Sequence, residues 1–179
     1  MRKIYYGKAV YDQKEINAVN NVLKNNKLNL IDGPHVKKIE KVVPKLFGKK
    51  YGLMVNSGSS ALILAFKVLN IKKNSEVITP CLNFGTAVSS IMLSGLVPVF
   101  VDCKIETLQI DVDKIEKKIS SKTKVILVPN LIGNIPEWFK IKKIAKKYNL
   151  KVIEDSADTL GAKIGNRSTG TFSDISITS

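Results

Sequence analysis

The spacing of the hydrophobic residues changes after Leu46. Before it, apolar residues recur every three or four positions, which is typical of amphipathic helices. One such stretch follows Asp12-Gln13-Lys14-Glu15, a segment that resembles a capping box, and its apolar face consists of Ile16, Val19 and Leu23. A second stretch has an apolar face made of Val36, Ile39, Val42, Val43 and Leu46. Pro44 should kink or shorten this second helix.

After Leu46, short apolar runs alternate with helical patterns. The sequence predicts strands at 51–55, 77–79, 97–101, 124–128 and 151–153, with further strands near 160–164 and 175–178. It predicts helices at 59–69, 85–94, 112–119 and 137–148. Strands that are continuously apolar and alternate with helices indicate a mostly parallel sheet flanked by helices. The predicted fold class is therefore α/β.

Length and composition favour one ordinary globular domain. The chain has 179 residues, of which 44% are hydrophobic, and this is enough for a real core. No apolar run approaches the length of a membrane span, and the first eight residues lack the pattern of a secretory signal. We expect a cytoplasmic protein with no membrane partner. Two isolated cysteines and a single His make a disulfide framework and a zinc site improbable.

The formal net charge of +14 leaves two interpretations open. A basic α/β module could bind polyanions such as nucleic acid. However, all but Arg2 and Arg167 of the 29 basic residues are Lys, whereas Arg is preferred for reading phosphates. Lys142, Lys143, Lys146 and Lys147 also fit the polar face of one predicted helix. We favour a solvated lysine surface and no nucleic-acid partner, and a binding face is the alternative.

Ligands of open parallel sheets bind at the carboxyl ends of the strands, so the residues there are candidates for a site. Asn56-Ser57-Gly58-Ser59-Ser60-Ala61 follows a predicted strand and opens a helix. Its hydroxyls and free N–H groups could bind a single phosphate monoester, since it lacks the patterns of a P-loop or a dinucleotide fold. The alternative is an ordinary serine N-cap.

Two further loops follow predicted strands. In the segment 79–86, Phe84 lies between a Pro and a Gly and could stack on a planar ring, although a loop Phe often covers a core. In the segment 152–158, Asp155 or Asp158 could bind a metal, act as a base or pair with a protonated ring nitrogen. A helix N-cap is the alternative for these carboxylates.

Two hydrolase mechanisms fit poorly. His35 is the only candidate base for a serine hydrolase, and its turn before a helix predicts a surface position. Glu154 and Asp155 make a poor glycosidase pair, because adjacent strand residues point to opposite faces.

Taken in order, these segments resemble the fold-type-I pyridoxal phosphate (PLP) enzymes of the DegT/StrS sugar aminotransferase family. The matching segments are 33–40, 55–62, 79–84, 95–102, 130–134, 154–162 and 170–174. The resemblance implies the large domain of a PLP-dependent transferase, with pyridoxal 5'-phosphate as cofactor. It implies an aminotransferase that acts on a nucleotide-linked keto-sugar, with an amino acid as amino donor, in surface polysaccharide or deoxy-aminosugar biosynthesis.

The resemblance also implies the residues that bind the cofactor. Ser59, Ser60 and Ser179 would bind the phosphate, and Phe84 would stack on the pyridine ring. Asp155 would pair with the ring nitrogen and keep it protonated, which makes the ring an electron sink. Asp158 stands where family members have another polar residue near the ring.

Family members are much longer than this chain, and their cofactor-binding Lys lies a few residues beyond the position of Ser179. We therefore expect residues 1–179 to be the N-terminal and large-domain portion, without the C-terminal small domain and without a catalytic residue. Residues 1–179 alone should not turn over substrate. The resemblance implies a homodimer for the longer protein.

Some residues depart from the aminotransferase pattern. Asn130 stands where many aminotransferases have His, and segments 131–134 and 158–161 look closer to the sugar 3-dehydratase branch. Those relatives have His in place of the Lys and remove a hydroxyl next to a keto carbon. Ser173 replaces a common Gly, and we have no interpretation of it. Aminotransferase is the leading prediction and 3-dehydratase the alternative.

Overall fold

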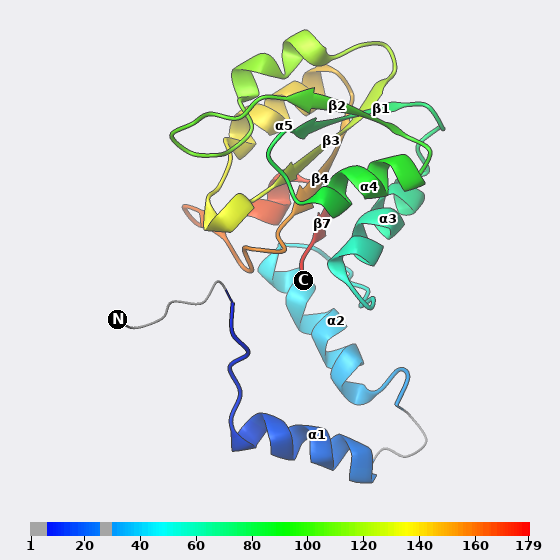
Figure 1. Ribbon diagram of the computed structural model, residues 1–179, viewed down its shortest axis with the longest axis vertical. Coiled ribbons are helices and arrows are strands. Elements are labelled where there is room, and N and C mark those ends of the chain that lie inside the picture. The colour runs from blue at the N-terminus through cyan, green and yellow to red at the C-terminus, as the bar shows by residue number, and fades with distance from the viewer. Residues whose placement is uncertain (1–6, 26–29) are drawn as a thin grey trace.

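The centre of the molecule is a five-stranded sheet in which all pairings are parallel. The computed structural model describes residues 7–25 and 30–179. The strands, in the spatial order β2-β1-β3-β4-β7, are β2 (Val97–Val101), β1 (Glu76–Pro80), β3 (Thr123–Pro129), β4 (Lys151–Asp155) and β7 (Ile175–Ile177) (Figure 1). The predicted α/β class and its mostly parallel sheet are confirmed.

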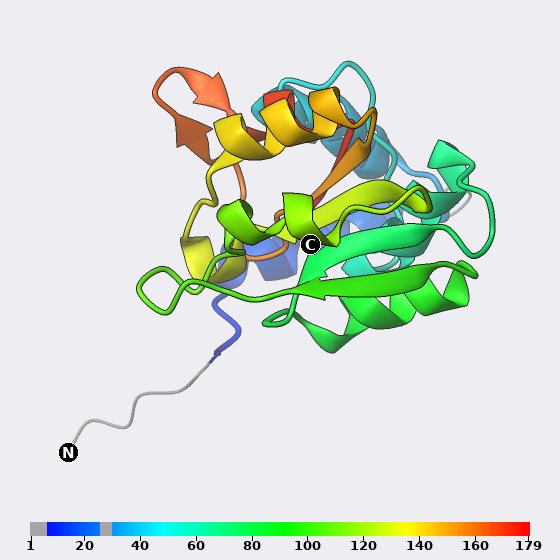
Figure 2. The same cartoon turned by 90° about the horizontal axis from the view of Figure 1, so that it is seen from above.

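Helices cover both faces of this sheet. Figure 2 shows α5 (Trp138–Lys147, yellow) on one side and α4 (Gly85–Leu93, green) on the other. Helix α3 (Gly58–Leu69) packs beside α4. The alternation of side chains along β3 explains the two layers. Val125 and Leu127 join the core below α3 and α4, whereas Ile126 and Val128 join the core below α5.

The two N-terminal helices are α1 (Gln13–Asn25) and α2 (Pro34–Leu46). The predicted capping box is confirmed, since the Asp12 N–H donates to Glu15 and the Lys14 N–H donates to Asp12, both at 2.7 Å. No residue of α1 is buried, and its predicted apolar face is exposed. Helix α2 ends two residues after Pro44, as the prediction of a shortened helix requires.

Three predicted elements differ from the structure. Residues 51–55 form no strand, because their backbone has no ladder partner among the described residues and the Met54 N–H donates instead to the Glu40 side chain, at 2.9 Å. The predicted helix 112–119 is two short 3₁₀ turns, η1 (Val112–Lys114) and η2 (Glu116–Lys118). In the 160–164 region, only β5 (Lys163–Ile164) forms, and it pairs antiparallel with β6 (Arg167–Ser168).

The remaining short elements are η3 (Leu131–Gly133) and η4 (Thr169–Phe172). Within the part of the chain that the structure describes, no helix has the length and apolar character needed to cross a membrane.

Candidate functional site

The first turn of α3 lies at the carboxyl edge of the sheet. Ser57 is its N-cap, and its Oγ accepts a hydrogen bond from the Ser60 N–H at 3.2 Å. The N-cap interpretation therefore holds for Ser57, and Ser59 and Ser60 lie just inside the helix. The first N–H groups of a helix have no partner within it, and the positive end of the helix dipole lies there. This turn can therefore also accept an anion.

Ser179 packs against this turn. A Cβ built on Gly58 would lie 3.2 Å from the Ser179 Cβ, so glycine is what allows the two segments to approach. The residue before Ser179 connects it to the end of β4, because the Thr178 hydroxyl donates to the Ser156 carbonyl at 3.0 Å. The structure thus brings Ser59, Ser60 and Ser179 together at the edge where Asp155 ends its strand.

Asp155 is the last residue of β4, and it is 8% exposed. Its Oδ1 accepts a hydrogen bond from the Ala157 N–H at 3.1 Å. Burial raises the pKa of the Asp155 carboxyl, and the nearby charges of Asp158 and Glu154 raise it further. Among residues 7–25 and 30–179, no cation forms an ion pair with it. A bound cationic ring nitrogen would supply the missing partner, so this carboxylate fits the predicted cofactor.

Phe84 lies after β1, as the N-cap residue of α4, and its side chain is 71% exposed. The loop before it is fixed by Asn83, whose amide donates to the Thr79 hydroxyl at 3.1 Å and whose carbonyl oxygen accepts from the Phe84 N–H at 2.8 Å. The ring is therefore not a cover for the core. It is held at the carboxyl edge of the sheet and is free to stack on a planar ligand.

Asp158 has a partner that the sequence did not predict. Its carboxylate accepts a hydrogen bond from the Ile132 N–H at 3.1 Å. Ile132 has a φ of 50°, a left-handed conformation that is unfavourable for a β-branched residue. Asp158 thus holds the strained turn η3 next to the site, and its side chain is exposed.

A second group of polar residues, which the sequence analysis did not single out as a group, lies on the α5 side of β4. Glu154 is fully buried and accepts hydrogen bonds from Asn130 at 2.9 Å, Ser156 at 3.0 Å and Ser176 at 2.5 Å. The indole N–H of Trp138 donates to Asn130 at 2.9 Å. We call these five residues the Glu154 network. The alternation along β4 was the available signal, because it places Glu154 on the face opposite Asp155.

The structure also places the remaining residues that the sequence analysis considered. His35 is exposed, as its position in a turn predicted. Cys81 and Cys103 are both free thiols. Among the described residues, no group of His, Cys, Asp and Glu could hold a metal ion.

A mostly parallel sheet flanked by helices, with a helix N-terminus and a buried carboxylate at its carboxyl edge, is the fold of the fold-type-I PLP-dependent enzymes. The family model for the DegT/DnrJ/EryC1/StrS aminotransferase family matches residues 10–179. The chain belongs to this family, and the predicted resemblance is confirmed.

Relatives in the family include both enzyme branches. The chain is 35% identical over 182 residues to GDP-4-keto-6-deoxy-D-mannose 3-dehydratase of Yersinia pseudotuberculosis, covering 96% of this chain and 46% of the relative. It is 39% identical over 163 residues to dTDP-3-amino-3,6-dideoxy-alpha-D-galactopyranose transaminase of Aneurinibacillus thermoaerophilus, covering 90% of this chain and 44% of the relative.

Two solved structures show the same fold. The aminotransferase from Psychrobacter cryohalolentis superposes with a TM-score of 0.84 at 33% identity, covering 89% of this chain and 40% of that one. The GDP-4-keto-6-deoxy-D-mannose-3-dehydratase of E. coli, solved with bound hydrated PLP, superposes with a TM-score of 0.81 at 32% identity, covering 89% and 42%. The chain thus spans less than half of the length of these relatives.

Proposed function

We propose that the chain is the cofactor-binding large-domain portion of a PLP-dependent enzyme that acts on a nucleotide-linked keto-sugar. The observation that carries this proposal is Asp155. It is a buried carboxylate with a raised pKa and no cationic partner among the described residues, at the same sheet edge as the first turn of α3. A protein does not keep such a charge for stability, because a buried carboxylate without a partner is unfavourable.

Each candidate residue has a role that matches its position. Ser59, Ser60 and Ser179 bind the phosphate of pyridoxal 5'-phosphate through hydroxyl and backbone donors at the helix N-terminus. Phe84 packs on one face of the ring, and Asp158 lies at the rim of the site. When bound, the cofactor supplies a sink for the electrons released at the substrate carbon. Asp155 holds a proton on the ring nitrogen, which keeps that sink strong.

The leading reaction is transfer of an amino group from an amino acid to the keto-sugar. A 3-dehydratase is the second candidate, and it is favoured by the two relatives with that name and by Asn130, which stands where many aminotransferases have His. Reading the coding sequence just beyond codon 179 separates the two reactions. A Lys a few residues past Ser179 supports transamination, and a His there supports dehydration.

The partners of the whole protein are part of the same proposal. They are a nucleotide-sugar, an amino-acid donor and a second subunit that completes a homodimer, in the cytoplasm and without nucleic acid. Helix α1 has an exposed apolar face formed by Ile16, Val19 and Leu23. Exposed apolar surfaces of this kind often bind another protein, so this face supports the proposed contact with a second subunit.

Cofactor binding by the purified chain tests the proposal. Pyridoxamine 5'-phosphate is the suitable probe, because as an amine it cannot condense with the many lysines of this chain. We expect saturable one-site binding in titration calorimetry, weakened at least tenfold in Ser59→Ala/Ser60→Ala. Substitution of Ser89, a serine of α4 whose hydroxyl donates within its own helix, is the matched control. Equal affinity in the two variants contradicts the phosphate site.

The polyanion-binding module makes a different prediction. Its binding would weaken steeply with salt and would not respond to changes at Asp155 or Phe84. Binding of the probe that persists in moderate salt and depends on these two residues excludes it.

A further inference from the structure

The lysines of α5 fall into two groups that differ in their partners. Lys140 pairs with Glu137 at 2.6 Å, and Lys147 pairs with Glu116 at 2.9 Å. Hydrogen bonds to these carboxylates raise the pKa of both lysines. In contrast, Lys142, Lys143 and Lys146 form no ion pair with any residue in the described ranges. The charges of Lys142 and Lys146, which are four residues apart and so lie on one side of the helix, therefore remain uncompensated.

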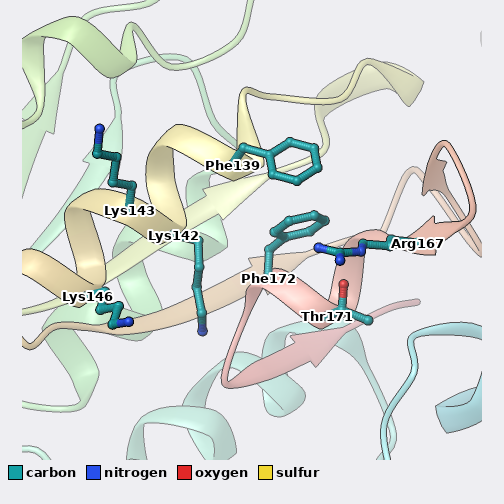
Figure 3. A pocket seen from close by; sticks show the side chains of 7 residues that line it. All are labelled: Phe139, Lys142, Lys143, Lys146, Arg167, Thr171 and Phe172. Carbon is teal, nitrogen blue, oxygen red and sulfur yellow. The ribbon is translucent and has the colours of Figure 1, made fainter.

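This side of α5 lines an open pocket of about 500 Å³ between α5 and the segment β6–η4. Figure 3 shows Lys142 and Lys146 extending to the same side of the helix, whereas Lys143 extends away from them. Arg167 reaches from β6 toward Phe172 and also has no ion pair among the described residues. It is one of only two arginines among the 29 basic residues of the chain.

The pocket also offers an aromatic surface. The rings of Phe139 and Phe172 meet edge to face, with centroids 4.7 Å apart. Phe172 is buried, but Phe139 is 55% exposed. An exposed ring held in place by a buried one can stack on a planar group at low entropic cost.

Electrostatics favours an anion in this pocket. Lys142 and Lys146 are one helical turn apart, and like charges at this spacing repel. Among the residues that the structure describes, the pocket is lined by no carboxylate. A bound anion would relieve this repulsion.

We propose that this pocket is a second binding site, separate from the cofactor site, for a nucleotide. Its phosphates contact Lys142, Lys146 and Arg167, and its base stacks on Phe139. The planar guanidinium of Arg167 matches two phosphate oxygens at once. The volume suits one small ligand. A small ligand fits better than a polymer such as nucleic acid, which binds along a continuous positive surface. Lys140 and Lys147 of α5 are neutralised by ion pairs, so the uncompensated positive charge is confined to the pocket. The pocket shares no residue with the candidate cofactor site.

Titration calorimetry of the full chain with ADP tests this site, in the presence of saturating pyridoxamine 5'-phosphate so that the cofactor site is filled. We expect ADP binding that weakens at least tenfold in Lys142→Gln/Lys146→Gln and in Arg167→Gln. The matched control is Lys140→Gln/Lys147→Gln, which removes the same charge from the same helix on its ion-paired side. If the test variant and the control variant weaken ADP binding equally, the proposed site is wrong, because the effect then depends only on the net charge of the protein.

Two further probes test the chemistry of the ligand. Phe139→Leu should weaken ADP binding about fivefold or more, as expected for the loss of a stacked base, and should leave inorganic pyrophosphate binding unchanged. Equal effects on both probes overturn the stacking role. A single-stranded DNA 20-mer that displaces ADP completely and binds far more tightly overturns the small ligand in favour of a polyanion. Circular dichroism of each variant should match the parent chain, and a variant that unfolds is replaced by the single change Lys146→Gln.

Discussion

Glu154 and Asp155 are adjacent carboxylates on β4, both buried, but their surroundings differ. Glu154 accepts hydrogen bonds from three side chains and belongs to a closed network within the chain. Asp155 accepts one hydrogen bond, from the Ala157 N–H, and its pKa is raised by burial. Glu154, whose hydrogen-bond partners all belong to the chain, stabilises the fold. Asp155, which lacks a cationic partner and lies at the edge where ligands bind, is available to bind a ligand.

The largest expected effect is on the stability of the Glu154 network. Glu154→Ala removes the acceptor of the buried donors of Asn130 and Ser156 and of the half-buried hydroxyl of Ser176. Unsatisfied buried groups cost about 1–3 kcal/mol each, so we expect a loss of about 3 kcal/mol or more in the free energy of unfolding. Urea unfolding can be followed by the fluorescence of Trp138, the only tryptophan, which lies in the network. A loss below about 1 kcal/mol would show that the network is not a structural unit.

Asp155→Asn should act on the cofactor instead. Removing one partner of a buried charge pair costs about 2 kcal/mol or more, which corresponds to about a 30-fold weaker binding of pyridoxamine 5'-phosphate. The conservative control is Asp174→Asn, a change of the same charge at an exposed carboxylate that caps the start of β4. Asp174→Asn should leave the affinity within about threefold, which corresponds to well under 1 kcal/mol. If Asp155→Asn binds pyridoxamine 5'-phosphate as tightly as the parent chain does, the ring nitrogen does not contact Asp155.

The pH dependence of stability should show the same contrast. The pKa of Asp155 is raised in the folded state, so the unfolded chain loses this proton first as pH rises above the ordinary value of 3.8. Folded protein then binds more protons than unfolded protein, and its stability falls as pH rises until the folded pKa is passed. Asp155→Asn lacks this titration, so the difference in unfolding free energy between variant and parent should grow with pH and then level off. Urea unfolding at a series of pH values measures it, and a difference that shrinks with rising pH would mean a lowered pKa.

The smallest expected effect is that of changing Asp158, the exposed carboxylate of the segment 152–158. Asp158→Ala removes one hydrogen bond to the Ile132 N–H, and we expect a stability loss of about 0.5–1 kcal/mol. Because the Asp158 side chain is exposed to solvent, we expect cofactor affinity to fall only about threefold, which corresponds to less than 1 kcal/mol. Calorimetry and urea unfolding of one preparation measure both quantities. If Asp158→Ala weakens binding of the cofactor as much as Asp155→Asn does, Asp158 contacts the ring directly.

Much of the fold could be predicted from the sequence because its signals are local. The continuous apolar strands β1, β3 and β4 predict burial on both faces, and the capping box of α1 predicts where that helix begins. The segment 51–55 has the composition of a strand, but a strand also needs a partner for its backbone. Sequence pattern alone does not supply that pairing.

In the candidate site too, some features follow from local sequence and others depend on contacts between distant segments. The positions of Ser59, Phe84 and Asp155 follow from the rule that ligands bind at the carboxyl ends of parallel strands. The contact of Ser179 with Gly58 and the hydrogen bond from Ile132 to Asp158 join segments far apart in the chain. The hydrogen bonds of Asn130 and Trp138 to the Glu154 network likewise depend on how α5 packs on the sheet. None of these contacts has a signal in local spacing.

Thermal unfolding of the parent chain and of Asp155→Asn, each with and without saturating pyridoxamine 5'-phosphate, tests the central claim most directly. We expect Asp155→Asn to have the higher Tm without the probe, because it removes an uncompensated buried charge. With the probe, the parent chain should gain more in Tm than the variant, because the ligand supplies the cation that Asp155 lacks. A variant that is less stable alone and gains as much from the probe as the parent does would show that Asp155 serves the fold and not the cofactor.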